Sequence, residues 1–245
     1  MEQSLVNDFD NAQREGFKVL SRLVQQLEVG MSEWDISELS KDLCRDAGFN
    51  TWFHPPEVQV GKNTTSNKVW KVPSKKHILQ KGDPVIIDLG PSDGHAYADV
   101  GTTVIFQGED TPFINVAREC VQATSGFASQ YKTVGELFVF AQAWAVNKRL
   151  KLASSRSIGH AILPKIGPLA FNYPRSAHAA TWLRRYQMRF LNPKQLHGIW
   201  AIRPLISDGN QAAAFEEMIY VSGDDYRLLG RDEGELAGSL PTDIL

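Results

Sequence analysis

The sequence of 245 residues contains only two cysteines, and neither belongs to a motif with the spacing of a metal site. Cys44 and Cys120 each fall in a segment with helical periodicity, so the sequence gives no indication of a disulfide framework or a cysteine-ligated zinc. This cysteine content favours a reduced protein, and we expect a cytoplasmic location.

Long apolar runs and an excess of one charge are also missing. No stretch approaches 18 consecutive apolar residues, and the polar N-terminus lacks the apolar core of a secretion signal, so we expect no membrane span and no export. The 26 basic and 28 acidic residues give a formal net charge of −2, which argues against nucleic acid or a membrane surface as a partner. A composition of 42% hydrophobic and 22% charged residues, without internal repeats, predicts one domain over residues 1–245.

The hydrophobic periodicity predicts helices around a β-rich centre. Amphipathic spacing predicts helices over 3–28 and between Ser32 and Gly48. A Thr-Pro start predicts a helix over 112–131, and a Thr-x-x-Glu capping box begins another over 133–151. Helices that follow a hairpin and cover one face of a sheet indicate an α+β domain.

Two aspartates interrupt the apolar centre of the sequence. Asp88 ends one β-rich run and Asp99 interrupts the next, although Asp is disfavoured inside strands and a buried carboxylate is costly. The turn-rich tetrapeptide at 91–94 predicts a hairpin between them. With the turn centred on the middle of this tetrapeptide, Asp88 faces Tyr97 and Ile86 faces Asp99. The two carboxylates are then diagonal neighbours roughly 7 Å apart, close enough to share a cation.

Isolated aspartates more often cap turns or form surface salt bridges, but no Lys or Arg occurs between Lys81 and Gly108. This stretch combines a Lys-Gly-Asp lead-in, an apolar-Asp-Leu-Gly run and Ala-Asp-x-x-x-Thr. It resembles the methionine aminopeptidase, aminopeptidase P and creatinase family of pita-bread metallopeptidases. The resemblance implies an α+β pita-bread fold, with a curved antiparallel sheet covered by helices, in which Asp88 and Asp99 are the first two of five metal ligands.

Later segments carry two of the remaining three ligand positions. His160, in a Gly-His pair, matches the third ligand, and Glu216, in a Phe-Glu pair, matches the fifth. Glu217 is next in the expected strand and should point to the opposite face. Arg203 stands where the resemblance places the fourth ligand, a glutamate.

The family's pocket histidines are only partly present. His54 lies seven residues before the Gly-x-Asn-Thr turn at 61–64, as does a histidine that lines the substrate pocket of short, single-domain aminopeptidase-P-like proteins. A loop histidine before a Pro-Pro bend is an equally good interpretation. Two further histidines of relatives are missing, at positions 66–67 and 166–167, and His178 follows too late to replace the second.

The arginine changes the metal chemistry that the resemblance implies. Relatives hold one ion at positions matching Asp88, Asp99 and Glu216, and a second at Asp99, His160, Glu216 and the missing glutamate. Exchanging glutamate for arginine removes a ligand, and the Arg203 guanidinium could itself pair with Asp99 or Glu216. We therefore expect at most one ion, at the site of Asp88, Asp99 and Glu216, with Arg203 in place of the other. The ion would be manganese, iron, cobalt or zinc, and a site that holds none is the alternative.

Three functions are compatible with this site. The first is a hydrolase of the aminopeptidase type that cleaves an amide or C–N bond in a short peptide or amino-acid-derived substrate, with catalytic roles for His54, Arg203 and Glu216 and substrate contacts from the first two. The second is a metal-free enzyme on a creatinase-like scaffold, and the third is a non-catalytic peptide-binding protein. Relatives suggest a homodimer. The basic segment 172–197 is either a solvated surface or a binding site for an acidic group.

Overall fold

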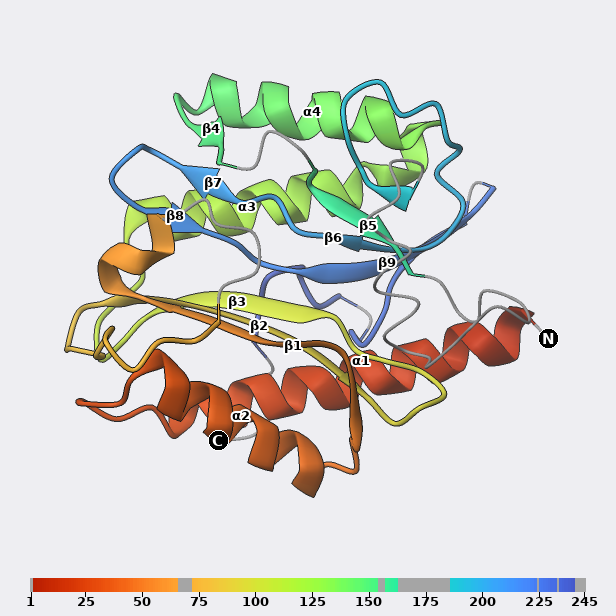
Figure 1. Cartoon of the computed structure of the whole chain (residues 1–245). Coiled ribbons are helices and arrows are strands. Elements are labelled where there is room, and N and C mark those ends of the chain that lie inside the picture. Colours follow the sequence, from red (N-terminus) through yellow and green to blue (C-terminus); the bar gives the residue numbers. More distant parts are fainter. Residues whose placement is uncertain are drawn as a thin grey trace.

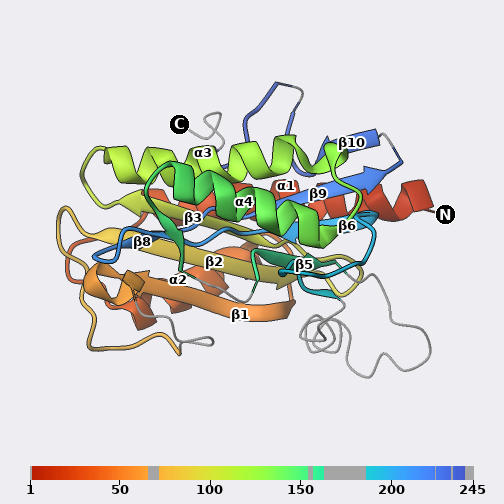
Figure 2. The same ribbon diagram turned by 90° about the horizontal axis from the view of Figure 1, so that it is seen from above.

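The computed structural model of the chain describes residues 2–65, 72–153, 157–162, 186–223, 225–232 and 234–240. Helices lie on two outer faces, and strands form the layers between them (Figures 1 and 2). No helix in these ranges is both long and apolar enough to cross a membrane.

The helical elements are α1 (Glu2–Gln25), α2 (Glu33–Asp46), η1 (Gly61–Thr65), α3 (Pro112–Gly126), η2 (Ala128–Gln130) and α4 (Val134–Asn147), where η marks a 3-10 helix. The strands are β1 (Thr51–Val60), β2 (Pro84–Ser92), β3 (Val100–Ile105), β4 (Lys151–Leu152), β5 (Gly159–Ala161), β6 (Gly198–Ile202), β7 (Ile206–Ser207), β8 (Ala212–Ala213), β9 (Glu217–Ser222) and β10 (Asp225–Leu228).

Side-chain caps fix the starts of the helices where the sequence predicts them. Capping boxes begin α2 at Ser32 and α4 at Thr133, and the Thr111 hydroxyl accepts a hydrogen bond from a backbone N–H of α3. The predicted helix over 112–131 is too long, because the chain tightens into the 3-10 turn η2 after Gly126.

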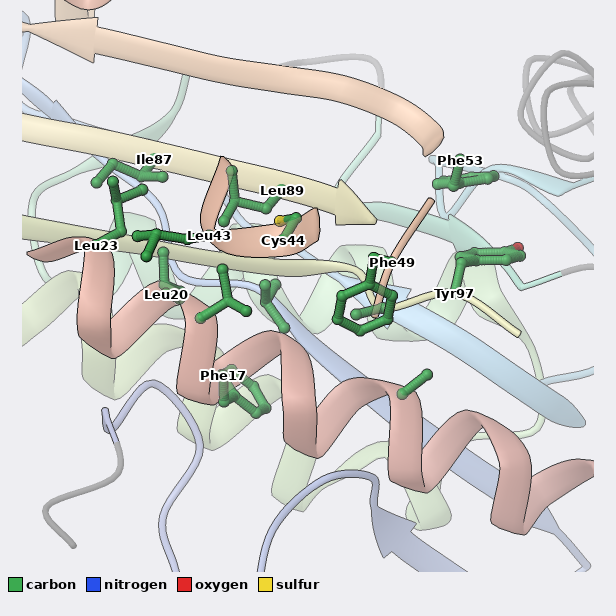
Figure 3. Close-up of a cluster of buried hydrophobic side chains, with 14 of the residues drawn as sticks. Phe17, Leu20, Leu23, Leu43, Cys44, Phe49, Phe53, Ile87, Leu89 and Tyr97 are labelled. Atoms are coloured by element: carbon green, nitrogen blue, oxygen red, sulfur yellow. The ribbon is translucent and has the colours of Figure 1, made fainter. Parts of the chain in front are cut away.

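The first sheet has the order β1-β2-β3 and packs on α1 and α2. Alternation along β2 turns Ile87 and Leu89 towards α1, where they meet apolar side chains that include Leu20 and Leu23 (Figure 3). Because the same alternation turns Asp88 to the other face of the sheet, this carboxylate points towards the second sheet.

The second sheet has the order β10-β9-β6-β5 and is covered by α3 and α4 (Figure 1). A small third sheet, β4-β7-β8, extends it. The two main sheets meet at a seam, where the Glu216 backbone N–H donates to the Gly101 carbonyl over 3.0 Å. The Thr103 hydroxyl adds two hydrogen bonds across this seam, since it donates to the carbonyl and accepts from the N–H of Ala214.

A buried ion pair lies next to this seam, at the residue that follows Glu216. Glu217 pairs with Arg231 at 2.5 Å, and their side chains are 0% and 2% exposed. Burial raises the pKa of Glu217, although the charge of Arg231 opposes the shift. The Arg231 guanidinium also lies over the Phe17 ring at 3.8 Å, so the pair connects α1 to the strand that follows Glu216.

We expect Arg231→Met to destabilise the protein by about 3–5 kcal/mol, because it leaves Glu217 buried without its cation. Denaturant unfolding would measure the difference. The matched control is Arg45→Met, since the Arg45–Asp42 pair is 71% and 66% exposed and should contribute at most about 1 kcal/mol. Equal losses in the two variants would contradict a structural role for the buried pair.

Candidate functional site

The hairpin of β2 and β3 brings Asp88 and Asp99 together, but in a register that the sequence analysis did not predict. Asp88 lies opposite Gly101 instead of Tyr97. The connection is longer than a simple turn, because the Asp93 carboxylate accepts hydrogen bonds from two backbone N–H groups beyond it. Asp99 is still the diagonal neighbour of Asp88, two residues from its partner, so the two carboxylates share one face.

Gln13 of α1 fixes the backbone of Asp99. Its side-chain amide donates to the Asp99 carbonyl and accepts from the Asp99 N–H, each over 2.9 Å, and Gln13 is fully buried. Sequence reasoning missed this residue. The available signal was a polar side chain within the apolar face of the first helix.

His54 lies between the two aspartates. Its Nε2 is 3.1 Å from Asp99 and 3.4 Å from Asp88, and the ring is almost completely buried. Gly90 makes room for this ring, since a Cβ at Gly90 would lie 2.5 Å from the imidazole. The other ring nitrogen, Nδ1, lies 2.9 Å from the Pro55 carbonyl, which can only accept a hydrogen bond.

His160 contacts the other oxygen of the same aspartate. Its Nε2 lies 3.1 Å from Asp99 Oδ2, and its Nδ1 lies 3.2 Å from the Ala161 carbonyl. The preceding Gly159 is required because a Cβ there would collide with the Ala201 carbonyl of β6. Because Gly159 lets β5 pack closely against β6, the next residue, His160, places its imidazole at the seam.

Arg203 follows β6 and lies against two carboxylates. Its Nε is 3.1 Å from Asp88 Oδ2 and 3.5 Å from Glu216 Oε2. Gly101 lies between these carboxylates in the sheet, because it pairs with Asp88 on one side and bridges Glu216 on the other. The expected contact with Glu216 is therefore present, but the second partner is Asp88 in place of Asp99, whose oxygens face the two histidines.

Glu57 of β1 completes the row of acidic positions. It lies opposite Asp88 in the register of β1 and β2 and is half-buried. Sequence reasoning missed it, because a Pro-Pro pair and two irregularities in strand pairing obscure the alternation of β1.

The charges of the site shift several pKa values. Burial alone would raise the pKa of Asp88 and Asp99, but the cations and hydrogen-bond donors around them outweigh burial and lower both values. Burial raises the pKa of Glu216 well above its ordinary value, and the two aspartates add to this shift. Burial would lower the pKa of His54, but the charges of and hydrogen bonds to both aspartates raise it well above its ordinary value.

The donor set fits a divalent cation. Asp88 Oδ1, Asp99 Oδ2 and Glu216 Oε2 are buried oxygens that form no hydrogen bond of good geometry, although a nitrogen of His54, His160 or Arg203 lies within 3.5 Å of each. Both histidines direct Nδ1 at a backbone carbonyl, so each neutral ring would present a bare Nε2 to the carboxylates, as a metal-ligating histidine does. The ligand atoms of two groups lie within 4.8 Å of one another, namely His54-Asp88-Asp99 and Asp99-His160-Glu216.

The structure therefore brings together all six side chains that the sequence singled out. Several other sequence-based expectations concern residues outside the described ranges, namely positions 66–67, positions 166–167, His178 and most of the basic segment 172–197. Arg189, in the described part of that segment, is half-buried.

We expect Gly90→Ala to displace the His54 ring and to weaken any ligand that depends on it, because the added methyl group overlaps the imidazole. Metal and peptide affinities should fall about tenfold or more, as they do when a supporting group of a metal site is lost. Calorimetric titration would measure both. The control is Gly126→Ala at the exposed end of α3, where a Cβ meets nothing within 4 Å; an unchanged affinity in Gly90→Ala would contradict the steric role.

Comparisons with known proteins agree with this architecture. The model of metallopeptidase family M24 matches residues 8–223. The X-Pro aminopeptidase from Thermotoga maritima is similar with a TM-score of 0.73 and 18% identity, over 96% of this chain and 63% of that one. The prolidase from Pyrococcus furiosus is similar with a TM-score of 0.70 and 17% identity, over 92% of this chain and 63% of that one. The methionine aminopeptidase from Thermotoga maritima is similar with a TM-score of 0.68 and 16% identity, over 94% of this chain and 97% of that one. No curated protein sequence matches significantly.

These similarities confirm the predicted α+β pita-bread fold. The chain spans about three fifths of the X-Pro aminopeptidase and prolidase chains and nearly all of the methionine aminopeptidase chain. At such identities the solved structures show the fold alone.

Proposed function

Since the chain belongs to metallopeptidase family M24, we propose that it is a metal-dependent hydrolase of the aminopeptidase type. Its substrate would be a short peptide or an amino-acid-derived compound, cleaved at an amide or other C–N bond. The observation that carries this proposal is the cluster of three buried carboxylates and two imidazole nitrogens at one seam, whose ligand atoms form two groups that could each hold an ion.

We propose that the site holds one ion, with manganese, iron, cobalt and zinc as candidates. Of the two groups whose ligand atoms lie within 4.8 Å of one another, we choose Asp99, His160 and Glu216, because Arg203 lies closer to Asp88 of the other group than to Glu216. The sequence favoured Asp88 in place of His160, but Arg203 lies close to both Asp88 and Glu216 and competes with an ion between them. A bound ion would polarise the scissile carbonyl and activate a water.

The protein groups supply the remaining functions. Burial favours the protonated form of Glu216, so this carboxylate is suited to accept a proton from water and to pass it to the leaving amine. The Arg203 side chain is 21% exposed, which leaves part of its guanidinium accessible to a substrate carboxylate or a developing oxyanion. His54 would contact the substrate from the other side of Asp88.

The test is release of the N-terminal residue from short peptides, followed by mass spectrometry. We expect turnover that a chelator abolishes and a divalent ion restores. Turnover that a chelator leaves unchanged would contradict metal dependence.

A metal-free enzyme or a non-catalytic peptide-binding protein is the second candidate. It is favoured by the cations that the chain already places against its carboxylates, namely Arg203 and His54. Chelator-insensitive turnover would support the metal-free enzyme. Measurable peptide binding without turnover of any peptide would support the binding protein.

We further propose a single domain over residues 1–245, which agrees with a composition without internal repeats, and a cytoplasmic location, which agrees with the cysteine content. The resemblance to the family suggests a homodimer. Light scattering of the purified protein would test the dimer. A monomer at micromolar concentration would contradict it.

A further inference from the structure

Glu57 occupies one end of a row of positions that crosses the site. It lies opposite Asp88, which lies opposite Gly101, which in turn bridges Glu216. Residues directly opposite each other in antiparallel strands project on the same face of the sheet. The Glu57 carboxylate therefore lies on the site face, next to Asp88 and on the side away from β3.

Among the described residues, Glu57 differs from the other carboxylates of the site because no hydrogen bond or ion pair holds it, although the charges of Arg203 and His54 act on it. Within the ranges that the structure describes, its carboxylate forms no hydrogen bond or ion pair, whereas Asp88, Asp99 and Glu216 all contact a cationic side chain. A half-buried carboxylate that has lost part of its hydration is costly unless a donor replaces the lost water. This position therefore favours a ligand that brings positive charge and hydrogen-bond donors.

A metal ion is not the ligand that the position of Glu57 fits best. Among the described residues, the two groups whose ligand atoms lie within 4.8 Å of one another do not include Glu57. Glu57 is therefore a neighbour of the metal ligand Asp88 in the sheet but is not itself a member of either group. A primary ammonium group has three donors and a full positive charge, which matches a carboxylate at the edge of a metal site.

We propose that Glu57 binds the α-ammonium group of the substrate and so selects peptides and amino-acid derivatives with a free amino terminus. This inference rests on the proposed function and names the substrate class of the same site. Arg203 lies 3.1 Å from Asp88 and carries the charge opposite to that of Glu57. The site would thus distinguish the cationic end of a substrate from its carbonyl or carboxylate end.

The test compares the affinities of one short peptide and its N-acetylated form by titration calorimetry, with a chelator present so that no hydrolysis occurs. For the wild type we expect roughly ten- to hundredfold weaker binding of the acetylated peptide, the loss typical of a charged hydrogen bond. In Glu57→Gln the two affinities should differ by less than about threefold. Glu57→Asp, which keeps the charge, should retain part of the preference.

The matched control is Glu28→Gln, an exposed carboxylate that no observed contact connects with the site, which should keep the wild-type preference. Full preference for the free amine in Glu57→Gln would overturn the proposal, and so would equal binding of both peptides by the wild type. Hydrolysis is measured separately. If no variant hydrolyses any peptide, the proposed enzymatic function fails, while the binding comparison still decides the role of Glu57.

Discussion

Asp99→Asn should weaken binding of the divalent ion by at least about 100-fold and abolish turnover of a short peptide. Asp99 belongs to both groups of potential ligands, and each of its oxygens lies 3.1 Å from an imidazole. The amide that replaces it is uncharged and presents one oxygen in place of two, so it is a poor ligand for a hard cation. Calorimetric titration with manganese or zinc measures the affinity, and mass spectrometry of peptide products measures the turnover.

This substitution should leave the fold intact, because Gln13 holds the backbone of residue 99 and not its side chain. A melting temperature close to that of the wild type would establish this. The control is Asp93→Asn in the turn of the same hairpin, where the side chain caps backbone N–H groups far from any ligand. Wild-type metal affinity in Asp99→Asn would exclude Asp99 as a ligand.

Arg203→Glu should raise the number of bound ions from one to two per chain. The exchange removes a guanidinium that lies 3.1 Å from Asp88 and 3.5 Å from Glu216, and it adds the carboxylate that relatives are expected to carry at this position. The local charge becomes more negative by two units. Without metal, the variant should be destabilised by about 3–5 kcal/mol, because buried carboxylates then lack their cation. Added metal should restore this loss.

Elemental mass spectrometry of protein purified without a chelator measures the ion count. Arg203→Met is the control, since it removes the cation without adding a ligand and should remain at one ion per chain. Two ions in the wild type would show that Arg203 does not replace one. No ion in any of the three proteins would favour metal-free chemistry or peptide binding.

The sequence predicted the parts of the site that short motifs encode. The Asp pair, the Gly-His pair and the Phe-Glu pair each combine an unusual residue with the local backbone that it requires, as Gly159 illustrates by its contact with β6. Of the two observed partners of Arg203, the sequence predicted Glu216 but not Asp88. The contact with Glu216 was expected from the charge and reach of an arginine at this position, whereas Asp99 is already engaged by His54 and His160.

What the sequence did not predict depends on hydrogen bonds and strand pairings between distant segments. The hairpin register failed because Asp93 and Ser92 bond to nearby backbone groups and lengthen the connection, a choice that periodicity does not encode. Glu57 and Gln13 were missed for a related reason. Their importance lies in the strand or loop that they meet, and neither has a motif of its own.

The most direct test of a single-ion peptidase is peptide turnover during stepwise addition of a divalent ion to metal-free protein. We expect release of the N-terminal residue to rise with the first equivalent of ion and to reach its maximum at one ion per chain, because Arg203 replaces the second ion. Turnover that starts only after the second equivalent, or that needs no ion at all, would contradict this expectation.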